Sequence, residues 1–379
     1  MTFESGSAHR FAFLDSLRGF AALYVVLCHM TFLSVPSLVL PHWLSDFIKM
    51  SASGVTLFFI VSAFSLSYTS LKHARDGTGL AGFYVRRFFR IAPLLYVMIF
   101  FHLYQISSYH VYFGIWDIVK NMLFVFNFFP GLQDGIVPAS WTIGVEMAFY
   151  AIFPFMLRWC SNLHRITVFV VASLLIAAAF HEVALYIIAD KVIRNGFLNF
   201  SIFTKMPVFA FGMMVYALFT NYINGKQLPR TLGVLLIVSA AYLYCALWNG
   251  KLDFLFINSE YWQSVIYGSL LLGLAIYPLS LLVNRVTIYL GRISYSIYLL
   301  HPLIVGFMLP IYQQIYKWHL PTTFKFAGCA LLTWGVVIGV GSITYRIIEL
   351  PGVRIGNRVL ALIRQRREIP ISLGTAMSS

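Results

Sequence analysis

Long apolar stretches, separated by short polar ones, run through the whole chain. A helix of about 20 apolar residues is long enough to cross a bilayer, so each such stretch predicts a membrane span. The stretches lie at residues 12–34, 52–71, 88–108, 141–158, 166–189, 203–222, 231–248, 263–283, 286–310 and 323–348. The pattern therefore predicts an all-α polytopic membrane protein with about ten transmembrane helices.

A further apolar segment, 111–129, differs from the others because it carries Asp117, Lys120 and Asn121. Charged side chains are costly inside the hydrocarbon region of a membrane. We therefore interpret this segment as an interfacial or re-entrant helix, not as a span.

The composition agrees with a membrane protein. Apolar residues make up 60% of the chain, charged residues make up 11%, and the mean hydropathy is +0.80. Soluble domains usually carry about 25% charged residues, so a soluble fold with so few charges could not cover its surface. The four cysteines form no CxxC pair. Neither a disulfide framework nor a metal site is expected.

The charge is unevenly distributed, with 27 Lys and Arg against 13 Asp and Glu. In membrane proteins Lys and Arg concentrate in cytoplasmic loops, and anionic lipid headgroups attract them. Most arginines lie in segments that the predicted spans place on the same side of the membrane as the N-terminus. This bias predicts that both termini are cytoplasmic. Lipid, and not nucleic acid, is the expected partner of this charge. We divide the chain into a transmembrane domain, 11–350, and a short basic cytoplasmic tail, 351–379.

The first span contains the ionisable residues Asp15, Arg18 and His29. Asp15 or Ser16 could cap the start of the helix. Arg18 and His29 are eleven residues apart, almost three helical turns, so they share one face about 16 Å apart along the axis. Arg18 could be a membrane anchor paired with Asp15, and His29 could be a structural core histidine; both could equally be functional.

The third and fourth spans carry the next group. Arg86 and Arg90 share a helical face at the predicted cytoplasmic mouth, with Arg87 beside them. Guanidinium groups bind phosphates bidentately, so the cluster suits a polyanion, although lipid headgroups would also explain it. Glu146 lies about 8 Å into its span, at the predicted depth of His29. A carboxylate at that depth could orient an imidazole base or form a structural clasp.

The ninth span contains Ser294, Tyr295 and His301, followed by Pro302. Pro302 removes a backbone donor and can kink the helix next to His301. The Ser and Tyr side chains give this span polar groups that must face protein or a cavity. A structural role and a functional role for His301 are both open at this point.

Six motifs in this order carry a resemblance to a known family. They are Phe13-Leu14-Asp15-Ser16-Leu17-Arg18-Gly19 with His29 eleven residues after Arg18, the segment 58–64, the segment 86–93, Trp141-Thr142-Ile143-Gly144-Val145-Glu146 with 147–150, the segment 293–301, and Glu349-Leu350-Pro351. Over residues 11–352 the chain resembles the membrane acyltransferase-3 family of bacterial O-acyltransferases. Members of that family acetylate sugars of lipopolysaccharide, exopolysaccharide, peptidoglycan and nodulation factors.

The resemblance implies an O-acetyltransferase of the bacterial inner membrane that moves an acetyl group from cytoplasmic acetyl-CoA to a hydroxyl of a periplasmic or cell-surface glycan. It implies His29, Glu146 and Arg18 as catalytic residues, and Arg86, Arg87, Arg90 and Arg18 as the site for acetyl-CoA. Supporting roles fall to Asp15, Trp141, Ser294, Tyr295 and His301. Whether His29 acts as a general base or carries the acetyl group itself stays open. The acceptor and the oligomeric state stay open as well.

Two other classes of protein fit the same residues. Intramembrane Arg, His and Glu would also suit a proton-coupled secondary transporter. A non-catalytic subunit for glycan export would tolerate substitution of Arg18, His29 and Glu146, whereas an enzyme would not. Transfer or hydrolysis of labelled acetyl-CoA by the purified protein separates an enzyme from a carrier.

Overall fold

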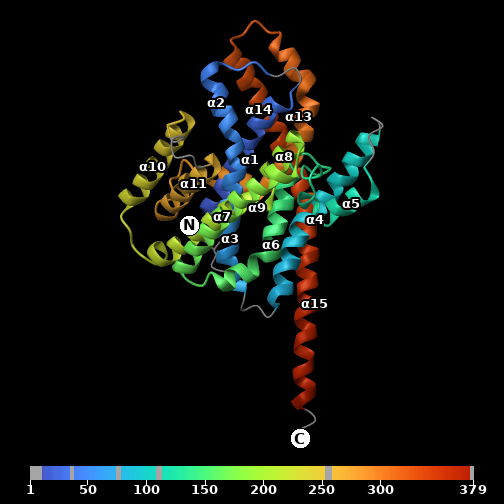
Figure 1. Ribbon diagram of the computed structural model, residues 1–379, viewed down its shortest axis with the longest axis vertical. Coiled ribbons are helices and arrows are strands. Elements are labelled where there is room, and N and C mark those ends of the chain that lie inside the picture. The colour runs from blue at the N-terminus through green and yellow to red at the C-terminus, as the bar shows by residue number, and fades with distance from the viewer. Residues whose placement is uncertain (1–10, 35–37, 74–77, 108–112, 252–257, 376–379) are drawn as a thin grey trace. The chain divides into compact units, whose positions relative to one another are not determined.

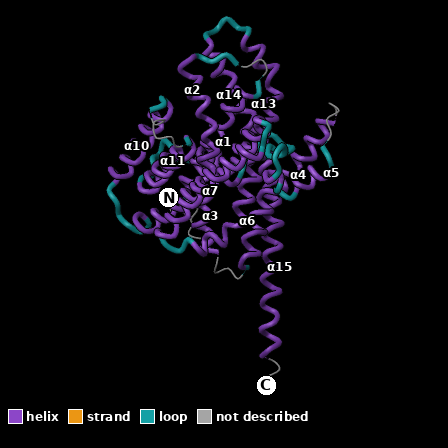
Figure 2. Tube along the Cα trace, viewed as in Figure 1, coloured by secondary structure: helices purple, strands orange, loops and turns teal. Residues whose placement is uncertain are grey.

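The computed structural model describes residues 11–34, 38–73, 78–107, 113–251 and 258–375. Within these ranges the chain forms helices joined by loops and contains no strand (Figure 2). The α-helices are α1 (Ala12–Phe32), α2 (His42–Met50), α3 (Gly54–His73), α4 (Gly79–Ser107), α5 (Ile115–Met122), α6 (Trp141–Trp159), α7 (Leu163–Ile187), α8 (Lys191–Asn199), α9 (Ile202–Leu218), α10 (Arg230–Trp248), α11 (Ser259–Ile276), α12 (Arg285–Arg292), α13 (Ser294–Tyr316), α14 (Thr322–Thr344) and α15 (Leu350–Thr375).

Eight helical stretches of the described chain are long and apolar enough to cross a membrane, which confirms the predicted all-α, multi-pass architecture. They are Ala12–Phe32, Leu44–Ser70, Gly79–Gln105, Leu163–Ile187, Lys191–Ile223, Arg230–Trp248, Ser294–Tyr316 and Thr322–Gln365. Two further predicted spans correspond to α6 and α11, which are helices of 19 and 18 residues but are not among the eight. The number of about ten spans and the cytoplasmic termini stay predictions.

Three predicted segments differ in detail. The span predicted at 286–310 is broken at Ile293, whose ψ of 5° is not helical; α12 ends before it, and Ser294 begins α13. Ser294 Oγ donates to the carbonyl of Gly291 (2.9 Å), so a side chain binds the backbone at this break. The span predicted at 323–348 continues through a π-helical turn, Tyr345–Glu349, into α15. The helix predicted within 111–129 is α5, of eight residues.

The chain divides into two compact units. Unit 1 comprises residues 1–65, 162–173 and 207–341, and unit 2 comprises residues 66–161, 174–206 and 342–379. This division does not follow the predicted boundary at residue 350, which stays a prediction.

In unit 1 the polar start of α1 packs closely against α12 through two glycines. A Cβ on Gly291 would lie 1.8 Å from the carbonyl oxygen of Asp15, and a Cβ on Gly19 would lie 2.9 Å from the backbone nitrogen of Gly291. Only hydrogen at these positions lets the two backbones touch. The contact holds the segment around Asp15 and Arg18 against a second helix.

In unit 2 helix α4 is supported by α15, and the two helices run alongside one another (Figure 1). A Cβ on Gly352 would lie 2.8 Å from the carbonyl oxygen of Phe89, and one on Gly356 would lie 2.8 Å from the Cβ of Phe89. Small residues four apart let two helices approach closely. The segment predicted as a basic tail, 351–379, therefore begins as a helix that packs on the arginine-bearing helix.

Candidate functional site

In unit 1 Arg18 is held inside the protein by two polar partners. Its Nη1 donates to Asp15 Oδ1 (3.3 Å) and its Nη2 donates to Ser65 Oγ (2.7 Å). The Arg18 side chain is 13% exposed and that of Asp15 is 2% exposed. Asp15 does not cap the helix as the sequence suggests, because α1 begins one turn earlier with Phe11 at the N-cap. Burying this ion pair has a desolvation cost, so the geometry indicates a fixed positive group and not a mobile surface anchor.

His29 lies near the end of the same helix, and its tautomer is fixed by the backbone. Its Nδ1 is 3.1 Å from the carbonyl oxygen of Val25. A carbonyl only accepts, so Nδ1 carries the proton and Nε2 carries the lone pair. A neutral imidazole with its lone pair on Nε2 can accept a proton or act as a nucleophile.

His301 from α13 lies beside His29. The two ring centroids are 4.7 Å apart, and the rings are inclined at 67°. His301 is completely buried, and its Nδ1 is 2.5 Å from the carbonyl oxygen of Tyr298. Thus two imidazoles, predicted separately from two spans, meet in unit 1. Ser294 and Tyr295 lie about two turns earlier on α13, where the hydroxyl of Ser294 binds the carbonyl of Gly291, and their supporting roles stay predictions.

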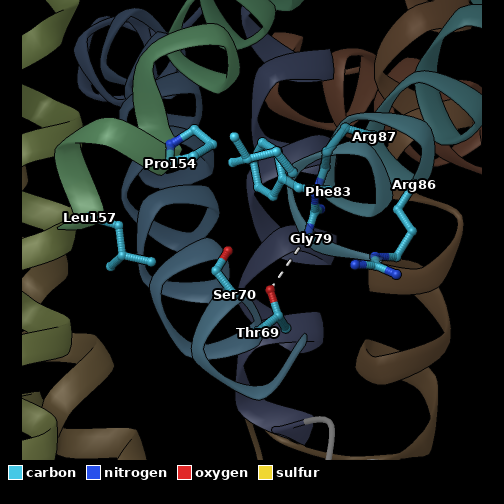
Figure 3. A pocket seen from close by; sticks show the side chains of 9 residues that line it. Thr69, Ser70, Gly79, Phe83, Arg86, Arg87, Pro154 and Leu157 are labelled. Carbon is cyan, nitrogen blue, oxygen red and sulfur yellow. Dashed lines mark hydrogen bonds between the residues drawn. The ribbon is translucent and has the colours of Figure 1, made fainter. Parts of the chain in front are cut away.

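Unit 2 contains a cavity of about 280 Å³ whose lining combines cations, hydroxyls and apolar groups (Figure 3). Its lining residues are Thr69, Ser70, Gly79, Leu80, Phe83, Arg86, Arg87, Pro154 and Leu157. Two of the three predicted arginines thus meet at one cavity. Arg90, one turn further along α4, does not line it. A cavity lined by guanidinium groups and apolar side chains suits a ligand that has both phosphate groups and an apolar organic part.

Arg87 is fixed at this cavity by aromatic rings and one hydroxyl. Its guanidinium carbon is 5.6 Å from the ring centroid of Tyr150 and 6.0 Å from that of Phe83. Its Nη2 donates to Thr69 Oγ1 at 3.5 Å, the contact drawn in Figure 3. Stacking on aromatic faces orients a guanidinium while leaving its edge able to bind an anion.

Glu146 is linked to the same arginine through Tyr150. The two residues are one turn apart on α6, and the hydroxyl of Tyr150 donates to Glu146 Oε1. Glu146, Tyr150 and Arg87 thus form a chain in unit 2. The predicted pairing of Glu146 with His29 of unit 1 stays a prediction.

Trp141, the first residue of α6, packs on aromatic and cationic neighbours. Its ring lies 4.4 Å from that of Phe200, and the Nζ of Lys205 lies 5.7 Å from its centroid. Lys205 is only 5% exposed, and the sequence prediction assigned it no role. Its position in a long apolar stretch was the available signal, because a buried lysine needs specific neighbours.

The start of α6 is set by Asn127 in the preceding loop. Its Nδ2 lies 3.2, 3.0 and 3.1 Å from the carbonyl oxygens of Gln133, Trp141 and Phe200. Gly144 makes room for this amide, because a Cβ there would lie 1.5 Å from Asn127 Oδ1. The loop therefore fixes the helix that carries Glu146 and Tyr150.

The described residues contain no group of three or more His, Cys, Asp or Glu side chains that could hold a metal ion. The arrangement instead offers nucleophile and base chemistry in unit 1 and an anion site in unit 2.

Comparison with known proteins agrees with this chemistry. A family model described as an acyltransferase domain matches residues 11–341. Nodulation protein 10 of Rhizobium leguminosarum bv. viciae is 24% identical, with 94% of this chain and 97% of that protein aligned. A putative acetyltransferase, ORF330, of Acidianus two-tailed virus is 24% identical over 79% of this chain and 86% of its own. The O-acetyltransferase OatA of Staphylococcus aureus is 22% identical over 93% of this chain, which spans 59% of OatA. No solved structure matches the chain significantly.

Proposed function

The chain belongs to the acyltransferase-3 family and is a multi-pass membrane O-acyltransferase, and from this premise we propose its donor and acceptor. The donor is cytoplasmic acetyl-CoA, and the acceptor is a hydroxyl group of a periplasmic or cell-surface glycan. The enzyme acts in the bacterial inner membrane. The name O-acetyltransferase that OatA carries supports an acetyl group as the transferred group and a hydroxyl oxygen as its acceptor.

The cavity of unit 2 is the proposed donor site. Arg86 and Arg87 bind the phosphates of CoA, with Arg90 adding positive potential one turn away. The apolar side chains of Phe83, Pro154 and Leu157 contact the organic part of the donor. A ligand with several phosphates and an apolar arm satisfies both kinds of lining.

His29 is the proposed catalytic group, and the observation that carries this proposal is its fixed tautomer. Because Val25 holds the Nδ1 proton, Nε2 presents a lone pair. That lone pair can take the proton of the acceptor hydroxyl, or it can attack the thioester carbon and carry the acetyl group itself; in both cases CoA leaves as the thiolate. Arg18, buried with Asp15 about three turns away from His29 on the same helix, is a fixed positive charge that we assign to binding of the anionic donor.

Glu146 supports the donor site through Tyr150. An ionised carboxylate that accepts the Tyr150 hydroxyl fixes that ring under the guanidinium of Arg87. The carboxylate also offsets part of the positive charge of the arginine cluster. In this proposal Glu146 acts on donor binding, in addition to its predicted action on His29.

The test is a comparison of cell-envelope glycans by NMR, using O-acetyl signals, in cells that produce the wild-type protein or His29→Ala at equal levels. The O-acetyl signal should disappear in the variant. Arg165→Ala, an exposed residue on α7, is the control and should retain the signal. Full O-acetylation by His29→Ala would refute the assignment. Wild-type protein that never releases CoA from acetyl-CoA would refute the donor.

A further inference from the structure

His301 and Pro302 form a local device that fixes one imidazole tautomer. In an α-helix the N–H of a residue bonds the carbonyl four residues earlier, so the carbonyl of Tyr298 would normally receive the N–H of residue 302. Proline has no N–H, and the carbonyl is left without that donor. His301 Nδ1 takes its place at 2.5 Å. The Nδ1 proton is therefore held on the helix backbone, and the lone pair is on Nε2.

That Nε2 atom is buried and has no hydrogen-bond partner among the described residues. Leaving a buried polar atom unpaired costs about 1–3 kcal/mol, and most buried polar atoms in proteins are paired. If His301 had only a structural role, a hydrogen bond to its Nε2 atom would stabilise the fold. The unpaired nitrogen instead lies on a ring whose centroid is 4.7 Å from that of His29, from a different helix.

The two imidazoles cannot both be positively charged. Two cationic rings at this distance would repel strongly in a site removed from water, so the pair holds at most one positive charge. Both rings have their Nδ1 protons bound to backbone carbonyls, and both present Nε2. In such a pair one imidazole can act as the nucleophile and the other as the proton acceptor.

We infer that transfer proceeds in two steps, with His29 carrying the acetyl group and His301 acting as the base of the second step. The inference rests on the proposed function. In the first step His29 Nε2 attacks the thioester carbon, the C–S bond breaks, and CoA leaves as the thiolate with the electron pair. His29 keeps its Nδ1 proton on Val25 and becomes an acetylimidazolium.

In the second step the oxygen of the acceptor hydroxyl attacks the acetyl carbon. His301 Nε2 takes the hydroxyl proton, the bond from carbon to His29 Nε2 breaks, and the electron pair returns to that nitrogen. His301 then releases its proton, which balances the thiolate formed in the first step. The burial of His301 fits this sequence, because an acetylimidazole must be kept from water until the acceptor enters.

The experiment separates the two steps using the full-length protein in detergent and acetyl-CoA labelled in the acetyl group. With acetyl-CoA alone, the wild type should release about one equivalent of CoA rapidly, and mass spectrometry of peptides should place the acetyl group on His29. Adding a cell-envelope glycan fraction should then discharge it. A wild type that transfers acetyl to the glycan but shows neither burst nor label without glycan would overturn the inference and leave the proposed function standing.

His301→Gln tests the second base. It should retain the CoA burst within about two-fold, whereas discharge of acetyl-His29 to the glycan should slow by about 10²-fold or more, the usual range for a lost general base. Hydroxylamine, which needs no base to attack an acylimidazole, should still discharge the label at the wild-type rate. Equal loss of burst and discharge would mean a structural role only and would contradict the inference.

If His301→Gln does not accumulate as folded protein, Pro302→Ala replaces it. This change returns an N–H to the carbonyl of Tyr298, where it competes with His301 Nδ1. Acetyl-His29 should then persist several-fold longer than in the matched variant Pro310→Ala, which alters the same helix α13 two turns away from the pair. Identical lifetimes in the two proline variants would overturn the role of His301.

Discussion

Arg87→Lys is the sharpest test of the donor site because it keeps the charge and removes the planar guanidinium. Lysine has no fork for bidentate binding of phosphate, and it stacks less well on the rings of Tyr150 and Phe83. A hydrogen bond to a charged group contributes about 1.5–3 kcal/mol. Losing one such bond to a CoA phosphate weakens binding about 10- to 150-fold, since each 1.4 kcal/mol is a factor of ten.

The assay is equilibrium dialysis of labelled acetyl-CoA against purified protein at two salt concentrations. Arg87→Lys should weaken binding in this range while keeping most of the salt dependence, because the positive charge remains. Arg87→Ala should weaken binding further and reduce the salt dependence. Arg165→Lys, the same chemical change at an exposed position outside the cavity, serves as the control.

The reasoning fails if Arg87→Lys binds acetyl-CoA within two-fold of the Arg165→Lys control. Such a result would mean that the guanidinium geometry, with its two rings and Thr69, is a structural feature of unit 2. The phosphates of the donor would then have to bind somewhere other than this cavity. Loss of binding with unchanged salt dependence in Arg87→Ala would contradict the electrostatic part of the argument alone.

Two other substitutions test the surroundings of the site. Tyr150→Phe keeps the ring under Arg87 but removes the hydroxyl bound to Glu146, so KM for acetyl-CoA should rise about 10-fold with a smaller change in kcat; the reverse split in steady-state kinetics would contradict a donor-site role. Gly291→Ala places a methyl group against the backbone of α1 and should cost at least about 1–3 kcal/mol, seen as a lower thermal midpoint. Gly306→Ala is its control, because nothing lies within 4 Å of the added Cβ, and an equal loss there would refute the packing argument.

The sequence predicted the membrane fold well because membrane spans depend on length and apolar composition, which can be counted directly. It failed at the boundary between α12 and α13. Residues 286–310 are apolar enough to look like one helix, but the break depends on the dihedral angles of Ile293 and on the contact of Ser294 with Gly291. Such contacts are not visible in composition.

The roles of the candidate site residues stay predictions, and the contacts that the structure shows between them were not predicted from the sequence. The motif spacings pointed to His29 and Arg87, because ionisable groups in apolar helices are few. Which side chains meet depends on packing between helices distant in sequence. The His29–His301 contact joins helices α1 and α13, and the contact of Arg87 with the ring of Tyr150 joins helices α4 and α6.

The contact between α4 and α15 has a consequence for the order in which the protein is made. Translation runs from the N-terminus, so the helix with Arg86, Arg87 and Arg90 leaves the ribosome long before Gly352 and Gly356 exist to cover its Phe89 surface. The donor helix therefore lacks this packing partner until α15, far later in the chain, has been synthesised. The match to the family model ends at residue 341, ahead of this helix. A shortened protein cut at that boundary would keep every proposed catalytic residue and lose the packing partner of its arginines.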